Sequence, residues 1–103
     1  MIILMPLSAK EEDEGQLVNL DKVVIWGFFE LLEGRVQNIE YLEDRNEYKA
    51  MIDVVVVADK NDYVWPFMEE SIPVLEAPIQ REIDDVIEAF LFKELYEVDG
   101  LGN

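Results

Sequence analysis

Short runs of apolar residues, or of alternating apolar and polar residues, recur along most of the chain between polar or glycine-containing segments. Five of them have the length and the β-branched or aromatic content of strands. They are Ile2–Met5, Lys22–Leu32, Arg35–Glu43, Ile52–Ala58 and Ile72–Leu75. The first, second and fourth runs are apolar at both alternating sets of positions, which is typical of strands covered on both faces. Glu33 and Gly34 predict a hairpin between the second and third strands.

Two of these strands have the features of sheet edges. Arg35–Glu43 is polar and alternates imperfectly, as an edge strand does. Pro73 lies inside Ile72–Leu75 and cannot donate a ladder hydrogen bond, so an edge position is expected there too. Pro6 is expected to end the first strand.

Two segments predict helices. Tyr63–Ser71 is one, with Pro66 tolerated only in its first turn. The second begins near Pro78, and its apolar residues recur at spacings of three and four to form one stripe. The stripe consists of Ile79, Ile83, Val86, Ile87, Phe90, Leu91 and Leu95. Asp44–Ala50 is a polar connection with room for one helical turn.

The order β-β-β-(short or missing helix)-β-α-β-α predicts an α/β fold, with a mixed, mostly parallel five-stranded sheet and helices on its faces. A chain of 103 residues has the size of one domain. We expect this domain to span residues 1–97 and residues 98–103 to form a flexible tail.

The charge balance narrows the range of partners. Asp and Glu number 24 against 8 Lys and Arg, a net charge of −16. Such a surface repels nucleic-acid phosphates and anionic membranes, so neither is an expected partner. The acidity has three interpretations: solubility or adaptation to salt or heat, an acidic face that docks a basic protein, or mimicry of a nucleic acid.

The chain has no cysteine and no histidine. Disulfides, thiolate-ligated clusters and Ser–His or Cys–His nucleophiles are therefore excluded. The softest side chains that remain as potential metal ligands include Met5, Met51 and Met68. The acidic run Glu11–Glu14 is either a solvated loop or a site for a hard cation, although it lacks the spacing of an EF-hand.

The sequence also gives little support for an enzyme that uses carboxylates as its catalytic groups. Asp53 and Asp59 flank the fourth predicted strand and are roughly 20 Å apart at the usual rise per residue, too far to share a metal pair. No pair of carboxylates is singled out for glycosidase chemistry. We therefore expect no metal site and no enzyme, and an enzyme based on carboxylates and a metal ranks last.

Four segments, in this order and spacing, carry a family resemblance. They are Trp26–Glu40 (WGFFELLEGRVQNIE), Ile52–Lys60 (IDVVVVADK), Ser71–Leu75 (SIPVL) and Arg81–Leu95 (REIDDVIEAFLFKEL). Together they resemble the NifX/NafY-like family, the dinitrogenase iron-molybdenum cofactor biosynthesis domain also found at the C-terminus of NifB. The resemblance covers about residues 1–97 and implies a ribonuclease-H-like sheet with a cofactor pocket.

Departures from the family pattern fall on that pocket. Asn19-Leu20-Asp21-Lys22 stands where the family has a motif like His-Phe-Gly-Arg. The helix expected after the third strand is reduced to Glu43–Met51, and Asp59 and Lys60 replace glycines after the fourth. The resemblance therefore implies a degenerate pocket, with no direct ligation of an iron-molybdenum or iron–sulfur cofactor.

The candidate rim for a ligand or partner follows from these positions. It consists of Asn19, Lys22, Arg45, Tyr48, Asp59, Lys60, Tyr63 and Trp65. The aromatic segment 63–67 either contacts a ligand beyond the strand ends or caps the core.

The expected function is that of a non-catalytic accessory or binding protein with a protein partner, which a basic surface would suit. The alternative is an acidic interaction module, which could form a homodimer through the edge Arg35–Glu43 or Ile72–Leu75. Met1–Pro6 lacks the basic and long apolar regions of a signal peptide, so a cytoplasmic location is expected.

Overall fold

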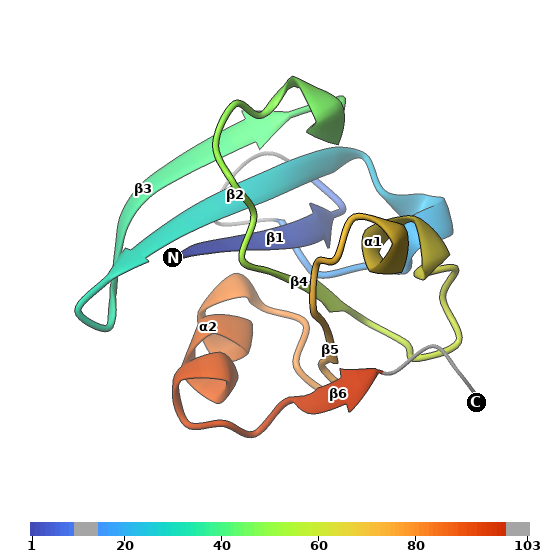
Figure 1. Ribbon diagram of the computed structural model, residues 1–103. Coiled ribbons are helices and arrows are strands. Elements are labelled where there is room, and N and C mark those ends of the chain that lie inside the picture. The colour runs from blue at the N-terminus through green and yellow to red at the C-terminus, as the bar shows by residue number, and fades with distance from the viewer. Residues whose placement is uncertain (10–14, 99–103) are drawn as a thin grey trace.

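A computed structural model describes residues 1–9 and 15–98 as a mixed six-stranded sheet with two α-helices (Figure 1). The strand order is β3-β2-β1-β4-β5-β6. The strands are β1 (Ile2–Leu7), β2 (Ile25–Leu32), β3 (Arg35–Leu42), β4 (Val54–Val57), β5 (Val74–Glu76) and β6 (Tyr96–Val98). The helices are α1 (Trp65–Glu69) and α2 (Ile83–Leu91), and Leu20–Lys22 and Arg45–Glu47 form 3₁₀ turns.

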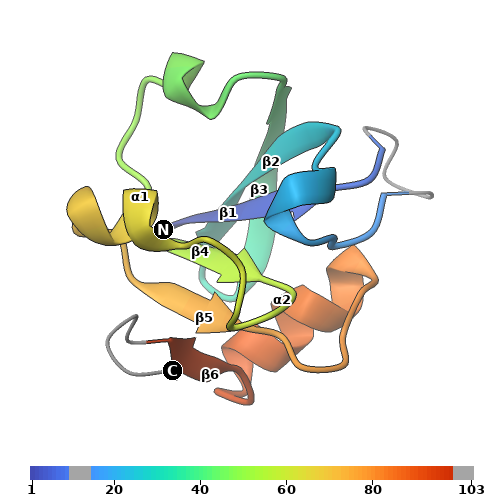
Figure 2. The same ribbon diagram turned by 90° about the vertical axis from the view of Figure 1, so that its right-hand side faces the viewer.

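Strands β1 and β4 form the centre of the sheet, and all their residues are buried. β1 runs antiparallel to β2 and parallel to β4. Successive side chains of a strand point to opposite faces of the sheet, so these two strands contribute to two hydrophobic cores. Ile3 and Val56 pack into the core on the α2 side. Leu4 and Val55 pack into the core on the α1 side. Figure 2 shows the two helices on opposite sides of the strands.

The mixed α/β architecture is confirmed, but the predictions of five strands and of a mostly parallel sheet are wrong. Three of the five strand pairings are antiparallel. β6 pairs antiparallel with β5, so the strand predicted as Ile72–Leu75 is internal and does not form an edge. Pro73 precedes β5, so its missing N–H removes no hydrogen bond from the ladder of this strand. Val98, predicted as the first residue of the tail, is buried in β6. The rest of that tail and the acidic run Glu11–Glu14 lie outside the described residues.

Strand β1 continues through Pro6, contrary to the prediction. β4 pairs with β1 only at Ile3 and Leu4, so no β4 carbonyl lies opposite the missing N–H of Pro6. The Pro6 carbonyl instead accepts a hydrogen bond from the Val18 N–H (3.1 Å). A proline is tolerated here because its missing donor faces away from the β2 ladder.

The helices are shorter than predicted at several ends. α2 begins at Ile83, because the chain before it is extended at Glu82, and Ile79 is left 81% exposed. It ends at Leu91, and Lys93, two residues further on, has a positive φ of 59° that a continuing helix does not allow. Pro66 lies in the first turn of α1, as predicted. Within the described residues, no helix has the length and apolar content needed to cross a bilayer.

The predicted hairpin between β2 and β3 is confirmed. Glu33 and Gly34 both have positive φ, 56° and 79°, as a two-residue type I′ turn requires. Val24 is 63% exposed and precedes β2, so this strand starts at Ile25 and not at Lys22. β3 is the outermost strand on its side of the sheet, as its polar pattern predicted.

Candidate functional site

The carboxyl ends of β1 and β4 lie side by side, and the chain leaves them in opposite directions along the sheet. β1 leads to β2 on one side, and β4 leads to β5 on the other. Ligands of open α/β sheets bind at such a switch point, because the diverging connections leave a crevice. A hollow of about 490 Å³ lies among these connections and is lined by Asn19, Leu20, Asp21, Asn61, Asp62 and Tyr63.

Asp62 joins the two walls of this hollow. One carboxylate oxygen accepts from the side-chain amide of Asn19 (2.9 Å), and the other accepts from the backbone N–H of Leu20 (3.1 Å). The 3₁₀ turn after the first loop is therefore tied to the loop after β4. Both oxygens of Asp62 and the amide nitrogen of Asn19 are already engaged within the protein.

The segment with Asp59 and Lys60, in place of the glycines of the family pattern, forms a tight polar turn. The Asp59 carboxylate accepts from the N–H of Asn61 (2.9 Å), and its carbonyl accepts from the N–H of Asp62 (3.0 Å). The backbone N–H of Lys60 donates to a carboxylate oxygen of Glu76 (2.9 Å). The backbone donors of this turn thus point at the protein's own carboxyl and carbonyl groups.

Arg81 lies at the same edge of the sheet, next to the carboxyl ends of β4 and β5, but it is not among the predicted site residues. Its Nη1 donates to the carbonyls of Ala77 (2.9 Å) and Gln80 (2.7 Å), and its Nη2 donates to that of Ala58 (3.3 Å). The half-buried guanidinium therefore links the residues that follow β4 and β5. One signal in the sequence could have found it: Arg81 is the sole basic residue between Lys60 and Lys93.

A second hollow lies on the α1 side of the sheet. The connection from β3 to β4, which replaces the helix of the family pattern, crosses over β2 and β1 (Figure 1). Tyr48 of this connection stacks on Phe28 of β2, with ring centroids 4.0 Å apart and planes 9° apart. Burial raises the pKa of the Tyr48 phenol, and the carboxylates of Glu40, Glu30 and Asp53 raise it further.

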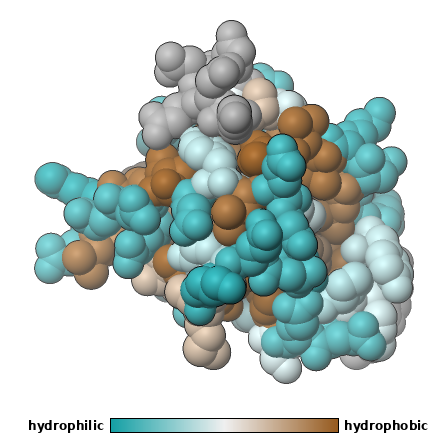
Figure 3. All heavy atoms as spheres, turned by 90° about the horizontal axis from the view of Figure 1, so that it is seen from above, coloured by the Kyte–Doolittle hydropathy of each residue, from teal (hydrophilic) through white to brown (hydrophobic). Residues whose placement is uncertain are grey.

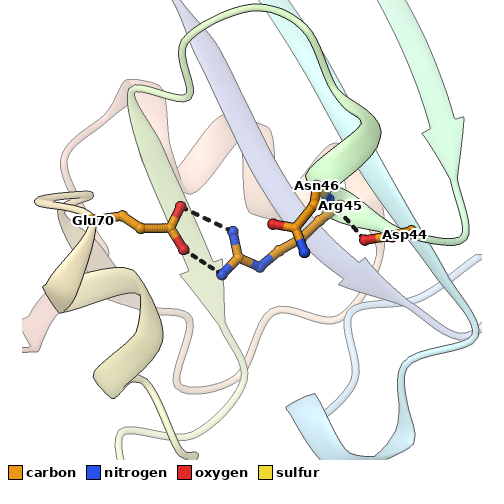
Figure 4. A network of polar contacts seen from close by, with 4 residues as sticks. All are labelled: Asp44, Arg45, Asn46 and Glu70. Atoms are coloured by element: carbon orange, nitrogen blue, oxygen red, sulfur yellow. Dashed lines mark hydrogen bonds and ion pairs between the residues drawn. The ribbon is translucent and has the colours of Figure 1, made fainter.

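Arg45 and Glu70 connect the same segment to the end of α1 (Figure 4). The guanidinium forms two hydrogen bonds to the carboxylate of Glu70, 2.7 and 3.3 Å long, and lies 4.5 Å from the ring centroid of Phe67. Hydrogen bonding to Arg45 lowers the pKa of Glu70, opposed by slight burial and assisted by the charge of Arg45. This is the one ion pair among the described residues.

The eight predicted rim residues are divided between these places. Asn19 and Tyr63 line the hollow at the carboxyl edge, next to the turn that contains Asp59 and Lys60. Arg45 and Tyr48 line the second hollow, of about 360 Å³. The remaining two, Lys22 and Trp65, are exposed and line neither hollow.

The comparisons with known proteins establish the fold. No family model matches the chain, and no curated protein matches it. The solved structure of PH0822 superposes with a TM-score of 0.70 at 17% identity, covering 94% of this chain and 96% of that one. The mj0327 protein of Methanocaldococcus jannaschii, described provisionally as a dinitrogenase, superposes with a TM-score of 0.70 at 15% identity, covering 96% and 95%. Identities this low show a common fold alone.

Proposed function

We propose that this chain is a non-catalytic accessory or binding protein, related to nitrogenase iron-molybdenum cofactor biosynthesis domains, whose cofactor pocket has lost its ligands. Two observations support a relationship. The sequence segments resemble that family, and the fold matches a protein described provisionally as a dinitrogenase over 96% of this chain. We infer the loss of the cofactor pocket from the side chains at the carboxyl edge, the side of the sheet where β1 and β4 end.

That set does not suit an iron cofactor. Iron–sulfur and iron-molybdenum clusters need thiolate or imidazole ligands from the protein. The carboxyl-edge hollow offers amide, carboxylate and phenol groups, and the chain has no cysteine or histidine to replace them. Asn19, at the position of the family's histidine, has its amide bonded to Asp62.

The charge of this edge also opposes an anionic cluster. Asp21, Asp59 and Asp62 bring carboxylates to it, and the chain as a whole has a net charge of −16. The guanidinium of Arg81 is directed at three backbone carbonyls. Any role in cofactor assembly would therefore act through contact with a protein partner.

The test compares the natural protein with a variant in which the family residues are restored. Asn19→His, Asp59→Gly and Lys60→Gly are combined in one variant, and Glu88→His, on the exposed side of α2, is the control for a misplaced histidine. Each protein is incubated anaerobically with ferrous iron and sulfide, and separately with isolated iron-molybdenum cofactor. The visible absorption is measured after desalting.

We expect the natural protein and the Glu88→His control to remain colourless and the restored variant to retain a chromophore. A chromophore retained in stoichiometric amount by the natural protein would contradict the loss of ligands. A restored variant that folds, by its circular dichroism, yet stays colourless would contradict the assignment of this edge as a degenerate cofactor pocket.

A further inference from the structure

The C-terminal end of α2 leaves part of the core on the α2 side uncovered. The helix ends at Leu91, and the chain after it turns away through Lys93 and returns to the sheet as β6 (Figure 1). Leu75 of β5 and Phe90 of α2 pack against this core but remain partly exposed. Leu91 itself is 42% exposed. Apolar side chains therefore reach the surface at the place where the helix stops.

These side chains surround a further hollow, of about 350 Å³, which we call the α2-end hollow. The described residues that line it are Leu75, Phe90, Leu91, Lys93 and Leu95, and four of these five are apolar. Binding sites for small molecules have this character: a mostly apolar concavity of about 300 Å³ or more, with few polar groups that fix the orientation of the ligand. The two hollows described above share no residue with it, and most of their lining residues are polar.

The surface at the other end of the sheet is different. Figure 3, seen from the β3 side, shows hydrophilic atoms over much of that face, with hydrophobic atoms between them. Scattered apolar side chains are normal on a protein surface, whereas a contiguous apolar lining is a feature of sites for ligands or partners. The α2-end hollow is of the second kind, since its apolar residues line one concavity.

The charge at the α2-end hollow favours an anionic ligand. Of the described residues that line it, Lys93 alone is charged. Its ammonium group forms no ion pair within the described ranges, 1–9 and 15–98, where the one ion pair joins Arg45 and Glu70. Glu97 is opposite Leu75 in the ladder of β5 and β6, but it is not part of the lining. An apolar ligand in the hollow would therefore meet a cation that has no acidic partner.

We propose that the α2-end hollow binds a small amphipathic carboxylate, such as a medium-chain fatty acid, with its apolar chain against Leu75, Leu91 and Leu95 and its carboxylate near Lys93. Burial of the chain supplies most of the affinity, because each methylene removed from water strengthens binding by about fourfold. The net charge of −16 opposes an anion, but physiological salt screens charges more than about 8 Å away. This site is separate from the carboxyl-edge hollow and goes beyond the function proposed above.

The test titrates the full chain with octanoate at physiological salt and follows the leucine methyl groups by NMR. Hexanoate tests the contribution of chain length, and octylammonium combines the same chain length with the opposite charge. Lys93→Gln removes the cation, and Lys49→Gln makes the same change of charge at an exposed position that lines none of these hollows. Leu91→Gln places a polar group in the lining at a position that is already exposed, so the fold should be kept.

We expect octanoate to shift the methyl signals of Leu75, Leu91 and Leu95 and to bind up to about fifteenfold more tightly than hexanoate, since two more methylenes are buried. Lys93→Gln should weaken binding by up to about fivefold, the effect of one exposed ion pair, and Lys49→Gln should have less effect. Leu91→Gln should also weaken binding, because part of the apolar lining is lost.

Three results would overturn the proposal. The first is that octylammonium binds at these leucines as tightly as octanoate, which would show that the hollow does not select an anion. The second is equal affinity of Lys93→Gln and Lys49→Gln for octanoate, which would show that Lys93 does not contact the carboxylate. The third is the absence of any shift at these leucines with millimolar octanoate.

Discussion

Tyr48 holds the connection between β3 and β4 on the sheet, and its truncation tests that role. This connection lies where a helix was expected after the third strand, and its partly buried apolar residues Tyr48 and Ile52 pack against the core on the α1 side. The Tyr48 ring lies parallel to that of Phe28, 4.0 Å away, and Phe28 is left only 1% exposed. The change Tyr48→Ala removes the stack and exposes Phe28 to water.

The expected loss can be worked from this geometry. A stacked aromatic pair contributes about 0.5–1.5 kcal/mol beyond the area that it buries. Burial of roughly half of an aromatic side chain adds about 1–1.5 kcal/mol. We therefore expect Tyr48→Ala to lower the free energy of unfolding by about 1.5–3 kcal/mol, which corresponds to a fall in Tm of at least about 6 °C for a domain of this size.

Urea unfolding followed by circular dichroism measures this loss. Tyr48→Phe keeps the ring and should stay within about 0.5 kcal/mol of the natural protein. Tyr63→Ala removes a tyrosine that is 73% exposed and should be similarly neutral. If Tyr48→Ala cost no more than Tyr63→Ala, the stack would not anchor the connection, and the reasoning would be refuted.

Three further changes test other contacts. Gly27→Ala should lower the free energy of unfolding by about 1–3 kcal/mol, because its Cβ would lie 2.6 Å from Cε1 of Phe29; urea unfolding measures the loss. Ser71→Gly should raise the urea midpoint by the equivalent of about 0.5–1 kcal/mol, since Ser71 has a positive φ of 61°. Arg45 lowers the pKa of Glu70, so the ion pair adds stability, at most about 1 kcal/mol, that depends on pH. This stability should be complete above the usual pKa of 4.5 and should be lost as the pH falls through the lower pKa of the folded state. Urea unfolding of the natural protein and of Glu70→Gln from pH 3 to 7 measures it.

Each of these has an outcome that would contradict it. A Gly27→Ala protein as stable as the natural one would mean that Phe29 can move aside without loss. An unchanged or lower midpoint for Ser71→Gly would mean that the positive φ is not strained. A stability difference between the natural protein and Glu70→Gln that does not shrink at acid pH would mean that the carboxylate of Glu70 contributes nothing through its charge.

Local patterns along the sequence were sufficient to predict most of the strands. The apolar run that contains β4 predicts a buried strand because four consecutive valines restrict χ1 and fill both faces of a sheet. Glu33 and Gly34 predict the hairpin because a two-residue turn needs positive φ. These features depend on a few neighbouring residues, so the sequence alone determines them. The absence of cysteine and histidine likewise limits the chemistry without any knowledge of the fold.

Contacts between distant segments were decided only by the tertiary structure. β6 is three residues long and has no pattern of its own, so only its pairing with β5 defines it and moves β5 away from the edge. The links from Arg81 to Ala58 and from Arg45 to Glu70 join residues far apart in sequence. Which residues of β3 bond to β2 likewise depends on which residues of β2 face β1. Such register and side-chain pairing arise when the chain closes on itself, and local periodicity carries no information about them.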